Sequence, residues 1–286
     1  MPKDDAEAKS DKTRKPPRRR VLGTLATWAV IGVVWLVVLG GATLAWFAYD
    51  LPSLDAALAS TRKPTVQVVA ADGTQMARFG ERRGDPIGIH EMPFYLVQAL
   101  VATEDRRFYE HFGVDVIGIA RASAANLRAG RIVQGGSTIT QQAAKNLFLT
   151  SERSLKRKVQ EVILALWLEE RFTKDQILSV YLNRVYFGAG TYGIEAAAQA
   201  YFGVAAKDLT LRQAAVIVGL LKAPSRLSPF VNPKGALERS NVVLASMVDA
   251  GFLDPASLAD EMKRPFRFEP PVDEKYLGKI QASSNE

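Results

Sequence analysis

The feature that most constrains the fold of this chain is the segment from Val21 to Tyr49, which contains no charged side chain. About 20 apolar residues span a bilayer as a helix, so the segment is long enough to do so with some tilt. Trp28, Trp46 and Tyr49 suit the two membrane–water interfaces. The apolar core of a signal peptide is shorter, and the length also disfavours the alternative of a buried helix in a soluble protein. We therefore predict a single transmembrane helix over residues 21–49.

The residues before this segment are strongly basic. Residues 1–20 contain eight basic and four acidic side chains, a net charge of +4 out of +7 for the chain. Such a tail could bind nucleic acid. Because the cluster from Arg14 to Arg20 directly precedes the apolar segment, the positive-inside rule explains it as a topology signal instead. We predict that the N-terminus lies in the cytoplasm and residues 50–286 outside it, with no nucleic-acid partner.

The composition excludes several kinds of chemistry. Apolar residues make up 48% of the chain and charged residues 23%, proportions that allow a folded core. The absence of cysteine excludes disulfides, thiolate metal sites and a cysteine nucleophile. His90 and His111 are the only histidines, which argues against a histidine-based metal site.

The region beyond the apolar segment divides into a linker and a helical domain. Short apolar stretches around Asp72-Gly73 predict a β-hairpin over Val66–Phe79, inside a linker of residues 50–85. Apolar spacing and capping residues predict the helices of a mainly α domain over residues 86–265. The predicted helices run from Pro93 to Glu104, Ser154 to Arg171, Thr173 to Leu182, Ala196 to Tyr201, Thr210 to Leu221, Leu237 to Ala250 and Pro255 to Lys263. Residues 266–286 are predicted to be a tail or the start of a linker.

A nucleotide-sugar transferase is disfavoured by this pattern. Such enzymes usually bind the nucleotide at the strand ends of an α/β sheet. The chain has no Gly-rich phosphate loop and no alternation of strands and helices.

Adjacent carboxylates, Glu104 and Asp105, end the first helix of this domain. They follow the apolar residues Leu100, Val101 and Ala102, and an apolar wall can turn a carboxyl group into a better general base near neutral pH. A solvated helix end is the alternative. On these two residues alone, that alternative is favoured.

A donor-rich stretch lies further along the chain, at Gly135–Gln142. Paired glycines let the backbone approach a ligand closely, and Ser, Thr and Gln side chains follow them. Lys145 and Asn146 come next at helical spacing from Gln142, so a donor-rich face would end in a cation that suits a diphosphate or a sugar. A capped helix start after a glycine turn explains the same residues equally well.

A third polar group combines Arg157, Lys158 and Glu161 on one predicted helix. Arg157 and Glu161 are four residues apart and share a face. They could be a carboxylate and cations directed into a cleft, or a surface ion pair worth only about 0.2–0.5 kcal/mol. The spacing does not decide between these interpretations.

Taken together, these stretches resemble the peptidoglycan glycosyltransferase family, found in class A penicillin-binding proteins and in monofunctional biosynthetic transglycosylases. The resemblance covers roughly residues 65–250. Its motifs occur in order at Glu104–Gly113, Gly135–Gln142 with Lys145-Asn146, Arg157–Glu161, Lys174–Asn183 with Tyr186–Gly188, and Ala196–Gly203 with Leu211–Pro224. Each piece alone is weakly specific, whereas the ordered set is very specific.

The resemblance implies a lysozyme-like helical fold with a membrane-facing lobe, and polymerisation of lipid II into β-1,4 glycan strands with inversion. It implies that Glu104 is the general base and that Glu161 assists departure of undecaprenyl pyrophosphate. Lys145 and Arg157 match the cations on that leaving group. The residues that shape or line the cleft, and so contact the substrate, would be Asp105, Phe108, His111, Thr138, Gln142 and Asn146.

The same resemblance implies the surroundings of the enzyme. The domain would lie on the outer, periplasmic side of a bacterial cytoplasmic membrane. Its partners would be lipid II, the growing glycan chain, membrane lipid and other proteins of cell-wall synthesis. No cofactor is predicted, and the need for a divalent cation, Mg²⁺ or Mn²⁺, with the pyrophosphate stays open.

Other interpretations remain to be tested. A glycan-cleaving enzyme shares the broad fold, but a neutral polysaccharide needs no cations such as Lys145 and Arg157. A non-catalytic scaffold is disfavoured by the presence of both Glu104 and Glu161. The extended segment Pro265–Val272 resembles an interdomain linker, so the chain is either monofunctional or a fragment of a bifunctional protein.

Overall fold

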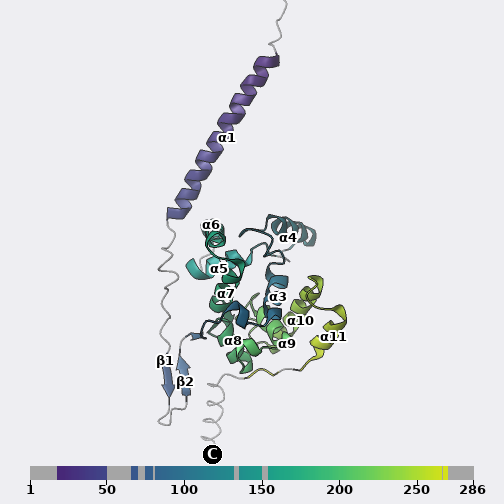
Figure 1. Cartoon of the computed structure of the whole chain (residues 1–286). Coiled ribbons are helices and arrows are strands. Elements are labelled where there is room, and N and C mark those ends of the chain that lie inside the picture. The colour runs from purple at the N-terminus through teal and green to yellow at the C-terminus, as the bar shows by residue number, and fades with distance from the viewer. Residues whose placement is uncertain are drawn as a thin grey trace, which may run out of the picture. The chain divides into compact units, whose positions relative to one another are not determined.

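A computed structural model of the chain describes residues 18–49, 66–69, 75–79, 81–131, 135–149, 154–265 and 267–269. The chain divides into two compact units, Met1–Asp50 and Leu51–Glu286. Figure 1 labels their α-helices and the strands β1 and β2. The boundaries expected inside the second unit, including the domain of residues 86–265, stay predictions.

The described part of the first unit, residues 18–49, is the helix α1 (Arg18–Tyr49), which is 32 residues long. It begins three residues before the predicted span, and its helical conformation is confirmed. Within the part of the chain that the structure describes, no helix combines the length and the apolar character that crossing a membrane requires.

The second unit begins with the expected hairpin. Strands β1 (Val66–Val69) and β2 (Gln75–Phe79) pair antiparallel, with Val66 opposite Phe79. The predicted turn at Asp72-Gly73 lies outside the described residues.

The helices predicted from capping and apolar spacing are confirmed. They are α3 (Phe94–Glu104), α6 (Leu155–Arg171), α7 (Lys174–Arg184), α8 (Ile194–Phe202), α9 (Leu211–Leu220), α10 (Pro233–Asp249) and α11 (Pro255–Lys263). Thr173 and Thr210 each accept a hydrogen bond from the backbone three residues later, completing the capping boxes of α7 and α9. Helix α10 begins four residues earlier than predicted, because Asn232 caps it and Pro233 occupies its first position.

Several elements were not predicted as such. Helix α4 (Val116–Ala129) buries only Gly118 and Ala122 and leaves the apolar side chains of Val116, Ile117 and Leu127 exposed. A small sheet has the order β3-β5-β4, with β3 (Arg82–Arg83) parallel to β5 (Thr191–Tyr192) and β4 (Tyr186–Gly188) antiparallel to it. Strands of two or three residues are too short for an alternating pattern. The 3₁₀ turns η1 (Ile89–Glu91) and η2 (Ala206–Asp208) complete the list.

The core forms around α9, which packs against α3 and α10. Helix α5 (Ile139–Phe148) packs instead against α6 and α7. Figure 1 shows these two groups of helices on either side of α3. The mainly α class is therefore confirmed, and the carboxyl end of α3 lies where the two groups meet.

Candidate active site

A cavity of about 520 Å³ opens at the carboxyl end of α3. Glu104 is the last residue of that helix, and Asp105 caps it. Both residues line the cavity, together with Thr138 and Gln142 at the start of α5. The structure thus brings the adjacent carboxylates and the donor-rich stretch into one site.

Glu104 is held by a short hydrogen-bonded chain that crosses three helices. Gln142 Nε2 donates to Glu104 Oε2 over 3.0 Å, and the Tyr181 hydroxyl of α7 donates to Gln142 Oε1 over 2.8 Å. Tyr181 is buried, and this burial, followed by the negative charge of Glu104, raises the pKa of its hydroxyl well above the ordinary value. The hydroxyl therefore keeps its proton and acts as a donor.

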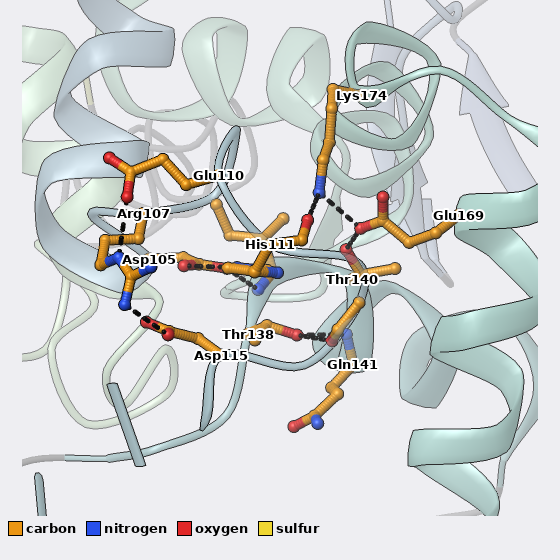
Figure 2. Close-up of polar contacts among 12 residues, drawn as sticks. Asp105, Arg107, Glu110, His111, Asp115, Thr138, Thr140, Gln141, Glu169 and Lys174 are labelled. Atoms are coloured by element: carbon orange, nitrogen blue, oxygen red, sulfur yellow. Dashed lines mark hydrogen bonds and ion pairs between the residues drawn. The ribbon is translucent and has the colours of Figure 1, made fainter. Parts of the chain in front are cut away.

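Asp105 ties the end of α3 to the start of α5. Its side chain accepts the backbone N–H of Ile139, the first residue of α5, over 3.0 Å and lies 3.0 Å from His111 Nε2. A carboxylate is favourable at a helix N-terminus, where unpaired N–H groups point outward. Figure 2 shows Asp105 and His111 directed toward each other. Asp105 therefore fixes the relative position of Glu104 and Gln142.

Phe108 and His111 support this arrangement from behind the cavity. Phe108 is fully buried, and the ammonium of Lys174 lies 4.4 Å from its ring centroid. Lys174 Nζ donates to the His111 carbonyl over 2.6 Å and to Glu169 over 2.7 Å (Figure 2). Neither Phe108 nor His111 is among the residues that line the cavity.

Thr138 is the N-cap of α5. Its hydroxyl accepts the backbone N–H of Gln141 over 3.1 Å and donates to the carbonyl of Gly113 over 2.7 Å. The capped helix start is thus real, and it faces the cavity together with Gly135, Gly136 and Ser137. The capped helix start is confirmed, and the ligand-binding role of this stretch stays a prediction.

The polar group on α6 centres on a buried carboxylate. Glu161 is only 5% exposed; its Oε1 lies 3.1 Å from Arg157 Nε and its Oε2 lies 2.9 Å from Lys158 Nζ. Arg157 Nε makes an ion pair rather than a hydrogen bond, because its N–H is not aligned with an acceptor. Lys158 also donates to Ser137 and Gln141, so α6 is joined to the start of α5.

The comparison with known proteins decides the family. The model of the transglycosylase family matches residues 72–248. The chain belongs to the transglycosylase family. The match contains the whole of the cavity except Asp249, and both polar groups on α5 and α6.

Relatives of this transglycosylase are known from several bacteria. Penicillin-binding protein 1A of Aquifex aeolicus is 47% identical over 70% of this chain and 27% of its own length. The Vibrio cholerae protein of the same name is 45% identical over 77% of this chain and 27% of its own length. A crystal structure of penicillin-binding protein 1A from Haemophilus influenzae matches 78% of this chain and 24% of that chain, with 24% identity and a TM-score of 0.46. The chain spans about a quarter of the length of the curated relatives that it matches.

Six of the predicted site residues do not line the transglycosylase cavity: Phe108 and His111, and four residues on α5 and α6. Arg157 and Glu161 lie on α6. Lys145 and Asn146 are exposed on α5, one turn beyond Gln142, and their side chains form no hydrogen bond or ion pair with the residues that the structure describes. Two of these four side chains are therefore accessible without breaking an existing contact.

Several cations around the cavity were missed by sequence reasoning. They come from the loop after α3, from α4, from the turn after α9 and from α10: Arg106, Arg121, Lys222 and Arg239. Arg106 and Lys222 lie inside the motif segments Glu104–Gly113 and Leu211–Pro224, where they were not singled out, whereas Arg121 and Arg239 lie outside every motif. A cluster of His, Cys, Asp or Glu able to hold a metal ion is not found among the described residues.

Proposed function

We propose that this transglycosylase is a peptidoglycan glycosyltransferase that polymerises lipid II into β-1,4-linked glycan strands in bacterial cell-wall synthesis. Family membership supports this activity. The observation that carries the proposal is Glu104, a carboxylate with one oxygen held by Gln142, at the edge of a cavity rimmed by cations. A base beside positive charge suits transfer from an anionic pyrophosphate donor.

Glu104 is the general base of the proposed reaction. It removes the proton from the 4-hydroxyl of the acceptor sugar while that oxygen bonds to the anomeric carbon of the donor. The bond from that carbon to the pyrophosphate breaks, and the configuration inverts. Because Gln142 engages Oε2, the other carboxylate oxygen is available to the hydroxyl. General-base catalysis of this kind contributes about 10²–10⁴-fold.

The leaving group, undecaprenyl pyrophosphate, is assigned to the cations of α5 and α6. Lys145 is exposed, and Arg157 retains a partly exposed guanidinium beside Glu161. Charge-assisted hydrogen bonds from these groups would stabilise the negative charge that grows as the pyrophosphate departs. Glu161 assists by holding Arg157 and Lys158 in place. The chemistry consumes no nucleotide.

The lipid substrate also gives the N-terminal helix a purpose. The uncharged segment Val21–Tyr49 anchors the enzyme in the bacterial cytoplasmic membrane, and the basic cluster Arg14–Arg20 keeps the N-terminus in the cytoplasm. Enzyme and lipid-linked substrates then share one surface, beside other proteins of cell-wall synthesis. A reporter fused after Glu286 should be active only outside the cytoplasm. A cytoplasmic signal would reject this orientation.

The activity is tested by Glu104→Gln in the full-length, detergent-solubilised protein. The parent should elongate lipid II, and the variant should lose about 10²–10⁴-fold in turnover, because the amide cannot accept the proton. Glu238→Gln is the matched control, since Glu238 is an exposed carboxylate on α10 outside the cavity. It should retain the parental rate.

Two results would count against the proposal. Near-parental turnover by a folded Glu104→Gln variant would reject this residue as the base. A parent that clears purified cell walls and does not elongate lipid II would identify a glycan-cleaving enzyme instead.

A further inference from the structure

Tyr181 has a buried hydroxyl that is connected to Glu104 through a single side chain, that of Gln142. Its hydroxyl donates to Gln142 Oε1 over 2.8 Å, and Gln142 Nε2 donates to Glu104 Oε2 over 3.0 Å. We propose that Tyr181 is a positioning residue for the general base: it fixes the amide of Gln142 so that its NH₂ group faces Glu104. This inference rests on the proposed function of Glu104.

The direction of this chain follows from the donors and acceptors available. A glutamine amide has an accepting oxygen and a donating NH₂ group, and a tyrosine hydroxyl can do either. Burial raises the pKa of Tyr181 well above its ordinary value, and the charge of Glu104 adds to this, so the hydroxyl keeps its proton. Turning the amide around would place its oxygen against the carboxylate, with no proton between the two acceptors.

The orientation matters because a base must be ionised to accept a proton. A donor directed at a carboxylate favours its charged form, whereas an acceptor directed at it favours the protonated form. Asp105 does not compete for Gln142, since its oxygens are engaged by Ile139 and His111. The Gln142 amide is therefore the contact of Glu104 that could turn around, and Tyr181 holds it with its NH₂ group toward Glu104.

The other charged groups that face Glu104 stay in place when Tyr181 changes. They line the same cavity from the loop after α3, from α4 and the residue before it, from the turn after α9 and from α10: Arg106, Asp115, Arg121, Lys222, Arg239 and Asp249. In the described part of the chain, none of them forms a hydrogen bond with the Tyr181 hydroxyl, which donates to Gln142. A substitution of Tyr181 thus isolates the effect of the amide.

Tyr181→Phe removes the hydroxyl and leaves the buried ring. Tyr201→Phe is its matched control: Tyr201 is also fully buried, burial raises its pKa to about 12, and its hydroxyl donates to a backbone carbonyl, that of Phe187, over 2.9 Å. Tyr201 does not line the cavity. Both variants lose a tyrosine hydroxyl. Tyr181→Phe loses it beside Gln142, and Tyr201→Phe loses it in the core.

The first test is a double-mutant cycle with Gln142→Ala, measured as lipid II polymerisation by the full-length protein. Tyr181→Phe should lower kcat about tenfold near neutral pH, leave KM within about twofold, and move the acid limb of the rate profile to higher pH. In the Gln142→Ala background, the same change should cost less than about twofold. Tyr201→Phe should leave rate and profile unchanged. A full tenfold loss that persists without Gln142, or a parental pH profile for Tyr181→Phe, would overturn the inference.

The second test does not depend on activity. The carboxyl carbon of Glu104 is followed by ¹³C NMR through a pH titration of the parent and of both Tyr→Phe variants. The midpoint should move to higher pH in Tyr181→Phe alone. An unchanged titration midpoint in Tyr181→Phe would reject the positioning role of Tyr181, even if polymerisation is confirmed. A parent that does not polymerise lipid II would reject the proposed function, and the NMR result would still decide on Tyr181.

Discussion

Helices α9 and α4 belong to the same domain, yet they are fixed in it by different forces. Every residue of α9 from Ala214 to Leu220 is buried, and the helix packs against α3 and α10. Helix α4 buries only Gly118 and Ala122 and exposes large apolar side chains such as Ile117 and Leu127. Burial of apolar surface therefore holds α9, and it contributes little to α4.

Helix α4 is positioned by polar contacts at its start. Asp115 precedes it and accepts a hydrogen bond from Arg107 NH1 over 3.2 Å (Figure 2). A side chain at Gly118 would meet this carboxylate, since a Cβ there would lie 2.2 Å from Asp115 Oδ2. Glu110 holds the same Arg107 from the other side. The apolar half of the domain supplies stability, and polar pairs place the walls of the cavity.

The largest expected effect tests whether burial stabilises α9 more than α4. Ile217→Ala in α9 should lower the free energy of unfolding by about 2–5 kcal/mol, because a fully buried side chain leaves a cavity in a tightly packed core. Leu127→Ala in α4 should change it by less than about 0.5 kcal/mol, because Leu127 is 84% exposed. Urea unfolding of the two variants measures both values. Equal losses would show that α4 is held by burial as α9 is.

The sequence predicted the part of the fold that depends on local signals. Thr173 and Thr210 mark the starts of α7 and α9 in the sequence, because a capping box is contained within four residues. Helix α4 lacks a capping hydrogen bond from Asp115, and the local signal at its other end, the left-handed Gly130, was overlooked. Strands β3 and β5 pair through a contact between residues that are far apart in the chain.

The residues of the candidate site were predictable from the sequence, but most of their contacts were not. Glu104 and Gln142 stand in recognisable motifs, and the structure joins them by a hydrogen bond. The role of Asp105 was not evident, because its partner Ile139 is 34 residues away. Tyr181 lies in another motif, and only its position on α7 beside α5 connects it to the base. Sequence patterns identify candidate groups; tertiary contacts assign their partners.

The second prediction tests whether a polar side chain near the site can be removed with a loss of activity and no loss of stability. Lys145→Ala should cost about 10²–10³-fold in turnover, by analogy with removal of one donor to a transition-state charge. Stability should stay within about 0.5 kcal/mol of the parent, because Lys145 is exposed. Lys207→Ala in η2 is the control, since it removes an equally exposed lysine outside the cavity. If both variants polymerised lipid II at the parental rate, Lys145 would have no part in binding the leaving group.

The third and smallest effect concerns Arg157, which already pairs with Glu161 Oε1 at 3.1 Å. If Arg157 only neutralises that buried carboxylate, a lysine could replace it, and Arg157→Lys would be nearly silent. If its guanidinium also forms two parallel hydrogen bonds to a phosphate, lysine cannot reproduce that geometry, and turnover should fall about tenfold. Arg264→Lys is the matched control, because Arg264 Nε lies at the same 3.1 Å from Glu261 and away from the cavity. Steady-state kinetics on lipid II should show a lower kcat with a nearly parental KM for Arg157→Lys alone, since the contact strengthens as the leaving group departs. Equal rates for both variants would reduce Arg157 to a structural ion pair and leave Lys145 as the cation assigned to the pyrophosphate.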